Sequence, residues 1–153
     1  YGDHRDLHLS LRRQRQMCIR DRHLIEQNLQ LILIPSNRTP KETITFAKEY
    51  FNKSRLIIDN VDKRAYLSSL ALSKYIVVTC DSSSMISEAA LTGKPVYVAM
   101  IPSMRNDKRF QKFRNLLESM NIIRKLEDDL DTWSYEKLDE TNRIAKQIKE
   151  KLF

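Results

Sequence analysis

Residues 75–98 read Y-I-V-V-T-C-D-S-S-S-M-I-S-E-A-A-L-T-G-K-P-V-Y-V, and this stretch decides the fold. An apolar, β-branched run from Tyr75 to Thr79 predicts a buried strand. A helical pattern from Ser84 to Thr92 follows it, and Gly93 stands where a helix commonly ends in the left-handed conformation. Because a second apolar run comes next, from Pro95 to Met100, the stretch predicts a parallel strand-helix-strand unit.

The same alternation continues on both sides of this unit. Short apolar runs predict two earlier strands, at Leu29–Ile34 and Arg55–Ile58, and helical spacing predicts further helices. We therefore expect an α/β fold, a Rossmann-like parallel sheet with helices on both faces. The further helices are expected at 39–51, Ala65–Ser73, Lys108–Met120 and Asp139–Leu152. The apolar side chains that should face the core from them are Ile44, Ala47, Tyr50 and Phe51; Leu67, Leu70 and Ala71; Phe110, Phe113, Leu117 and Met120; and Ile144, Ala145, Ile148 and Leu152.

Composition excludes several classes of site. The chain of 153 residues has a formal charge of +7 and only 2 glycines, which cannot form either familiar glycine-rich phosphate loop. All 3 histidines precede Leu24, so the main body cannot build a Ser-His-Asp or Cys-His pair or a histidine-ligated metal site. Any chemistry there would therefore use carboxylates, hydroxyls and Arg or Lys side chains, or the catalytic base lies on another piece of the protein. We predict no metal site. No apolar run is long enough for a signal peptide or a membrane-spanning helix, so we expect a cytoplasmic location.

Residues 1–22 differ from the rest of the chain. Their middle part, R-R-Q-R-Q-M-C-I-R-D-R from Arg12 to Arg22, resembles the translated sequencing adapters found at the ends of metagenomic assemblies. We expect this segment to be a non-native leader, and residues 23–153 to be a fragment of a longer protein. The alternative is a basic arm that binds nucleic acid or anionic lipid. Without the segment the charge falls from +7 to +4, which does not argue for a nucleic-acid partner.

Three consecutive hydroxyl side chains, Ser82 to Ser84, lie between the best predicted strand and its helix. Their hydroxyls and the N–H groups of the first helical turn could hold a phosphate, which the helix dipole favours by about 0.3–1 kcal/mol. Glu88 comes four residues after Ser84 and could accept hydrogen bonds from two ribose hydroxyls. In the alternative reading one serine only caps the helix, worth about 1 kcal/mol, and Glu88 is an exposed acid.

A second polar loop, S-N-R-T-P from Ser36 to Pro40, follows the first predicted strand. Thr39 as N-cap, Pro40 at the first helical position and Glu42 closing a capping box predict a helix start here. Arg38 could offer two parallel hydrogen bonds to a phosphate, or it could point into solvent. A basic set on a later helix, Lys108, Arg109 and Lys112, is either a solvated face or a surface for a diphosphate or an anionic membrane.

Several of these segments together resemble the carboxyl-terminal half of the mitochondrial-fission "elongated mitochondria" family, which occurs in plants and bacteria and is similar to GT-B glycosyltransferases. Within the pattern, Asn37 stands where the family typically has a second Arg, and Cys80 and Ser83 replace its usual Ala and Val. The matching stretches run in family order: S-N-R-T-P (36–40), A-Y-L-S-S-L-A-L-S-K-Y-I-V-V-T (65–79), D-S-S-S-M-I-S-E-A-A-L-T-G-K-P-V-Y-V (81–98), R-F-Q-K-F (109–113) and W-S-Y-E-K-L-D-E-T-N-R-I-A (133–145).

The resemblance implies that residues 23–153 form the carboxyl-terminal, nucleotide-sugar-binding domain of a GT-B-like protein. It implies that the turn from Ser82 to Ser84 holds the phosphates and Glu88 the ribose. GT-B enzymes usually place the acceptor and the catalytic base on the amino-terminal domain, so this chain would have no turnover alone and that missing domain would be its partner. The ligand would be a nucleotide-diphosphate sugar, with no other cofactor. The candidate binding residues are Ser36, Arg38, Thr39, Asp81, Ser82, Ser83, Ser84, Met85, Glu88 and Arg109.

The resemblance also supports an alternative function, because plant relatives act in mitochondrial fission by helping to place a dynamin-type GTPase at the organelle surface. A protein of this kind would be a non-enzymatic adaptor that associates peripherally with the inner face of a membrane. The third hypothesis is a nucleic-acid-binding function, which none of the motifs indicates.

Overall fold

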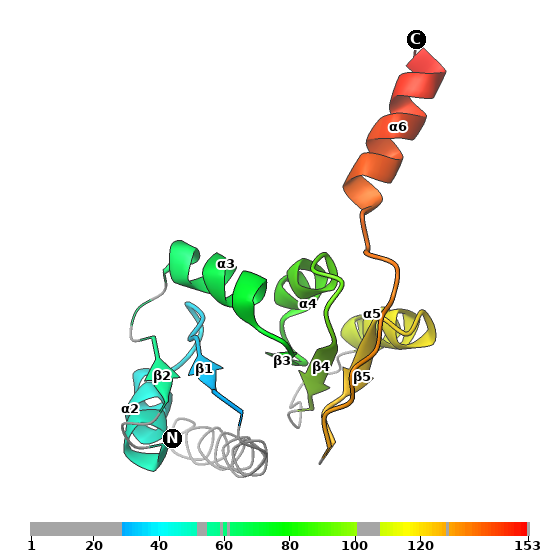
Figure 1. The fold of residues 1–153 in the computed structure, drawn as a ribbon. Coiled ribbons are helices and arrows are strands. Elements are labelled where there is room, and N and C mark those ends of the chain that lie inside the picture. The colour runs from blue at the N-terminus through cyan, green and yellow to red at the C-terminus, as the bar shows by residue number, and fades with distance from the viewer. Residues whose placement is uncertain are drawn as a thin grey trace, which may run out of the picture.

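The computed structural model describes residues 29–51, 55–58, 60, 62–100, 108–127 and 129–152; the expected leader, residues 1–22, lies outside this range. Strands and helices alternate along the described chain (Figure 1). The strands are β1 (Ile32–Leu33), β2 (Leu56–Ile57), β3 (Ile76–Thr79), β4 (Val96–Ala99) and β5 (Ile123–Lys125). The helices are α2 (Lys41–Phe51), α3 (Lys63–Leu72), α4 (Ser83–Ala90), α5 (Lys108–Ser119) and α6 (Glu140–Leu152).

The strands form two small parallel sheets, so the predicted Rossmann-like α/β class is confirmed. β1 pairs with β2, and β3, β4 and β5 form a second sheet in that order. In the second sheet Val96 lies opposite both Ile76 and Ile123. Figure 1 shows the strands from left to right as β2, β1, β3, β4 and β5. Among the described residues no strand pairing joins β1 to β3, so the two sheets are separate.

The main core lies between one face of the three-stranded sheet and the helices α4 and α5. Ile86, Ala89 and Ala90 of α4 are fully buried there, and Leu117 contributes from α5. Ile76 and Val78 face this core while Val77, between them, faces the other side of the sheet, as the period of two in a strand requires. α4 is therefore anchored along its length, which fixes the turn that precedes it.

The opposite face of the same sheet is aromatic and is covered by the chain after β5. Tyr97 is buried there beside Trp133, with the two rings edge to face and their centroids 5.1 Å apart. Leu130 packs against the same cluster. In the first sheet, Ala47 and Phe51 of α2 form a separate small core.

Several expected features of the helices and strands are wrong. Leu67 and Ala71 of α3 are exposed, as are Tyr50 of α2, Phe110 of α5 and Met120, which directly follows α5. They are exposed because none of them belongs to the apolar clusters that these helices form with the sheets. The apolar residues of α6 are exposed as well, because this helix extends away from both sheets (Figure 1). β5 was not among the strands predicted from the sequence. Among the described residues, no helix is long and apolar enough to cross a membrane.

Candidate functional site

The turn from Asp81 to Ser84 joins the carboxyl end of β3 to α4, as predicted. Ser82 is the N-cap residue, with φ −116° and ψ 83°, and its side chain forms no capping hydrogen bond. The turn is closed by the backbone instead: the Ser82 N–H donates to the Thr79 carbonyl at 3.2 Å, and the Ser82 carbonyl accepts from the Ile86 N–H at 3.1 Å. The Ser82 hydroxyl therefore does not take up the N–H groups of the first turn of α4.

The three serine side chains differ in exposure. Ser82 is buried, with 5 % of its surface exposed, whereas Ser83 is half-buried and Ser84 is exposed. Asp81, just before them, is exposed. Met85 is half-buried, and its side chain packs against the main core. Of the three hydroxyls, that of Ser84 is thus the most open to solvent.

Glu88 lies one turn further along α4 and is exposed. Since it follows Ser84 by four residues, the two side chains lie on the same face of the helix. Burial, with a smaller contribution from the Glu88 carboxylate, raises the pKa of Tyr66 in α3 well above its ordinary value. α3 therefore brings a phenol close to Glu88. Tyr66 was not predicted from the sequence, because helical spacing alone does not show which element a side chain faces.

Arg114 is a second residue that the sequence analysis missed. It is only 7 % exposed, and its Nη1 donates a hydrogen bond to the Cys80 carbonyl at 2.8 Å. Cys80 is also held by its own N–H, which donates to the Ala99 carbonyl at 3.1 Å. α5 thus supports the residue that directly precedes the turn from Asp81 to Ser84, called the serine turn below. Helical spacing could have indicated the burial of Arg114, because Arg114 lies three residues before Leu117 and therefore on the apolar side of α5.

The first polar loop closes on itself. The Ser36 N–H donates to the Thr39 hydroxyl at 2.9 Å, and the Thr39 N–H donates back to the Ser36 carbonyl at 3.0 Å. The Ser36 hydroxyl accepts from the Arg38 N–H at 3.2 Å. Because α2 begins only at Lys41 and the Thr39 N–H bonds to Ser36, the expected capping box with Glu42 is wrong. The Arg38 side chain is exposed.

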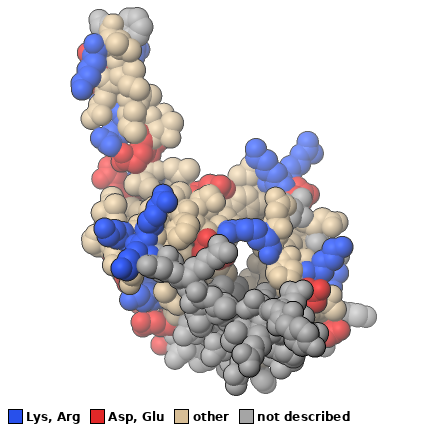
Figure 2. Space-filling model, turned by 180° about the vertical axis from the view of Figure 1, so that it is seen from behind, with Lys and Arg blue, Asp and Glu red and all other residues tan. Residues whose placement is uncertain are grey.

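The structure brings some of the candidate residues together and leaves others apart. Ser82 to Met85 and Glu88 lie on one helix end, and Ser36, Arg38 and Thr39 share one loop, but no hydrogen bond or ion pair among the described residues joins these two groups. Arg109 is exposed in the first turn of α5, beside Lys108 and near Lys112. Figure 2 shows Lys and Arg in several separate groups on the face it presents, one of them on α6. The described residues contain no cluster of metal-ligating side chains.

Comparison with known proteins identifies the family. The model of the family "Mitochondrial fission ELM1" matches residues 2–152. The chain is 35 % identical over 121 residues to the uncharacterized protein RP120 of Rickettsia prowazekii (strain Madrid E), an alignment that covers 74 % of this chain and 34 % of that protein. It is 34 % identical over 122 residues to mitochondrial fission protein ELM1 of Arabidopsis thaliana, covering 76 % of this chain and 28 % of that protein.

No solved structure matches the chain. The aligned part of the chain spans about a third of the length of these curated relatives. The family model, in contrast, matches almost the whole chain, from residue 2 to residue 152. The chain therefore belongs to the mitochondrial fission ELM1 family.

Proposed function

We propose that this chain binds the nucleotide-sugar donor in a larger, GT-B-like protein related to glycosyltransferases, and that it has no turnover by itself. The observation that supports this most is the open start of α4. Ser82 caps the helix through its backbone, so the N–H groups of Ser83, Ser84 and Met85 are not occupied by its hydroxyl. N–H groups at a helix start, together with the helix dipole, favour a bound phosphate.

Glu88 supplies the second part of the proposed site. Its exposed carboxylate lies on the same side of α4 as the Ser84 hydroxyl, at a separation of about 5–6 Å between the two Cβ atoms. A phosphate at the helix start and a ribose at Glu88 would therefore lie along one helix face. The exposed guanidinium groups of Arg38 and Arg109 each offer paired donors that would add to phosphate binding if the ligand reaches them.

A thermal-shift experiment with UDP-, GDP-, CDP- and ADP-sugars tests the proposal. A ligand that binds only the folded chain stabilises it by about 2.7 kcal/mol at about 100 times its Kd. For a domain of this size that corresponds to a rise in Tm of about 5–10 °C. We expect at least one of the four nucleotide sugars to give a shift of this kind.

The variant Glu88→Gln should lose most of this shift, because an amide cannot accept hydrogen bonds at both of its end atoms. Glu49→Gln is the matched control, since Glu49 is an exposed acid on α2 outside the site. A shift that persists in Glu88→Gln would show that Glu88 has no part in binding. If none of the nucleotide sugars changes the Tm of the unaltered chain, the proposed function is wrong.

A second function, a membrane-surface adaptor, is favoured by α6. Ile144, Ile148 and Leu152 recur every four residues and form one stripe, and all three are exposed. Lys149 and Lys151 lie at the two edges of this stripe, where their stems could cover apolar surface while their ammonium groups meet lipid phosphates. Helices with this pattern lie in the interface of anionic membranes, here the proposed inner face.

Co-sedimentation with vesicles tests the adaptor function. The chain should sediment with vesicles that contain phosphatidylserine, and less so at high salt, because screening weakens the attraction of the lysines. Ile148→Glu should remove binding, whereas Gln147→Glu makes the same change of charge beside the stripe and should retain most of it. Failure of the unaltered chain to sediment with anionic vesicles would rule out this second function.

A further inference from the structure

The buried hydroxyl group of Tyr66 in α3 makes no hydrogen bond of ordinary geometry in the structure, although the Glu88 carboxylate lies near it. Three buried side-chain atoms share this property in the part of the chain that the structure describes, the other two being Thr43 Oγ1 and Arg55 Nε. Buried polar atoms are almost always hydrogen-bonded in folded proteins, and an unmade hydrogen bond costs free energy. An orphaned hydroxyl beside a candidate binding site therefore calls for a functional explanation.

The backbone of α3 holds this hydroxyl in place. Leu70, one helical turn after Tyr66 and on the same face, packs against the main core. The last turn of α3 is fixed to the start of β4, because Lys94 Nζ donates to the Leu70 carbonyl at 2.8 Å and also to the Ala71 carbonyl. Tyr66 therefore faces α4 from a helix that is tied to the same sheet.

On α4, the Glu88 carboxylate lies near enough to the Tyr66 hydroxyl to influence its ionisation. Burial and this carboxylate together raise the pKa of Tyr66, so the phenol keeps its proton throughout the physiological range. A neutral phenol can donate one hydrogen bond, and an ionised carboxylate has two oxygens that accept. Glu88 itself is exposed, so its side chain has room to move toward the phenol or toward a ligand.

We propose that Tyr66 is a positioning residue for Glu88, an inference that rests on the proposed nucleotide site. When a ligand is bound, the Tyr66 hydroxyl donates to one oxygen of the Glu88 carboxylate. The other oxygen is then held in a fixed direction and accepts a hydrogen bond from a ribose hydroxyl. Fixing a flexible, exposed side chain in its binding conformation strengthens binding by reducing the entropy lost on association.

The pair would also select the class of ligand. A fixed carboxylate oxygen strengthens the binding of a nucleotide whose sugar ring carries a hydroxyl donor. It does not strengthen the binding of a nucleotide that lacks this donor. The Tyr66–Glu88 pair should therefore favour ribonucleotides over nucleotides whose ribose hydroxyls are missing. A merely structural role of Tyr66 predicts no such preference.

Calorimetric titration of the unaltered chain and of Tyr66→Phe tests this proposal. The probes are UDP, GDP, CDP and ADP, together with their 2′,3′-dideoxy counterparts. For each ribonucleotide that binds the unaltered chain, Tyr66→Phe should raise Kd by about tenfold, the usual effect of one hydrogen bond to a charged group. The Kd of the dideoxy counterpart should change by less than about twofold. Tyr50→Phe, on the exposed side of α2, is the matched control and should change neither.

The Tm of the variant without ligand gives a second readout. Because Tyr66→Phe removes an unpaired buried hydroxyl, we expect the Tm to stay the same or to rise. If Tyr66→Phe left the Kd of the ribonucleotides and of their dideoxy counterparts the same as in the unaltered chain, the positioning role alone would be overturned. Equal weakening of both classes would also overturn it, since that is the effect of a structural defect. If no nucleotide binds the unaltered chain, the proposed function fails and this inference fails with it.

Discussion

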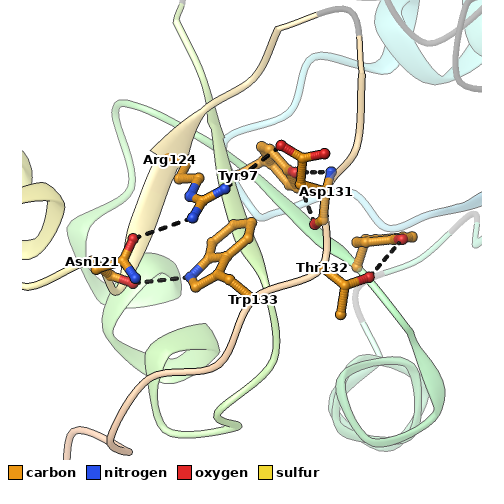
Figure 3. A network of polar contacts seen from close by, with 7 residues as sticks. Tyr97, Asn121, Arg124, Asp131, Thr132 and Trp133 are labelled. Carbon is orange, nitrogen blue, oxygen red and sulfur yellow. Dashed lines mark hydrogen bonds and ion pairs between the residues drawn. The ribbon is translucent and has the colours of Figure 1, made fainter.

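Tyr97 and Asp131 exchange two hydrogen bonds across the aromatic face of the sheet (Figure 3). The Tyr97 hydroxyl donates to the Asp131 carbonyl at 3.0 Å and accepts from the Asp131 N–H at 2.6 Å. A single side chain on β4 thus satisfies both backbone groups of one residue in the segment that follows β5. Next to this pair, Trp133 donates from Nε1 to the Asn121 carbonyl at 2.9 Å, and the Arg124 guanidinium lies 4.2 Å from the Trp133 ring centroid.

Tyr97→Phe should lower the free energy of unfolding by about 1–3 kcal/mol, because it leaves two backbone groups of Asp131 without their partner. Urea unfolding at neutral pH measures this change. Tyr75→Phe is the matched control: its hydroxyl makes one exposed contact, 3.1 Å from the Thr132 hydroxyl, and its loss should cost less than about 0.5 kcal/mol. Equal losses in the two variants would show that the contacts with Asp131 do not hold the segment.

The strands that are buried on both faces could be predicted from the sequence. β3 and β4 are continuous apolar runs, and their positions were expected to within one residue at each end. β5 could not be found in this way, because two of its three residues are Arg124 and Lys125. Its polar side chains are satisfied by tertiary contacts: Arg124 with the Trp133 ring, and Lys125 with Glu118 at 3.7 Å. Contacts between residues that are distant in the sequence cannot be predicted from the local order of apolar and polar residues.

The candidate site was likewise predicted only in part. The serine turn and Glu88 follow one another along the chain, so the order of a strand and a helix is enough to place them together. Tyr66 and Arg114 reach the same region from α3 and α5, and helix spacing fixes their face but not the element that they meet. The apolar stripe of α6 illustrates the reverse case, since helical spacing predicted burial for residues that no described element covers.

Gly93→Ala should destabilise the fold by about 1–2 kcal/mol, which urea unfolding can measure. Gly93 has a φ of +72°, a left-handed conformation that costs a residue with a Cβ about this much. An added Cβ would also lie 2.9 Å from Lys137 Cε and 3.0 Å from Lys137 Cγ, but both atoms belong to one exposed side chain that can change its rotamer. The same loss is therefore expected when Gly93→Ala is made together with Lys137→Ala. Full recovery in the double variant would mean that the contact, and not the backbone conformation, causes the loss.

Arg114→Lys should destabilise the chain by about 1–3 kcal/mol, because a single ammonium group cannot reproduce the buried guanidinium that donates to the Cys80 carbonyl. Arg109→Lys on the same helix is the control, since Arg109 is exposed and should change stability by less than about 0.5 kcal/mol. Hydrogen exchange of the amides from Asp81 to Met85 provides a local readout, and it should become faster only in Arg114→Lys. If exchange of these amides is unchanged in Arg114→Lys, Arg114 does not stabilise the serine turn.

Stability should fall as the pH rises above about 10, because Tyr97 and Tyr135 resist ionisation in the folded chain. Burial raises the pKa of Tyr135 above its ordinary value of 10.0, and burial raises the pKa of Tyr97 in the same way. Between the ordinary and the raised pKa the unfolded chain releases a proton that the folded chain retains. Unfolding is then favoured as pH rises, by up to about 1.4 kcal/mol per pH unit for each such group.

The variant Tyr135→Phe tests two contributions of this residue to stability, the hydrogen bonding of its hydroxyl and the resistance of this hydroxyl to ionisation. Its single O–H is shared between the carbonyls of Ala90, at 3.2 Å, and Lys94, at 2.9 Å, so the variant should be less stable by about 1–3 kcal/mol at pH 8. It also lacks one group of raised pKa, so its stability should fall less steeply above pH 10 than that of the unaltered chain. Urea unfolding at pH 8, 9, 10 and 10.5 measures both effects. Parallel curves for the two proteins would mean that Tyr135 ionises as readily in the folded chain as in the unfolded one.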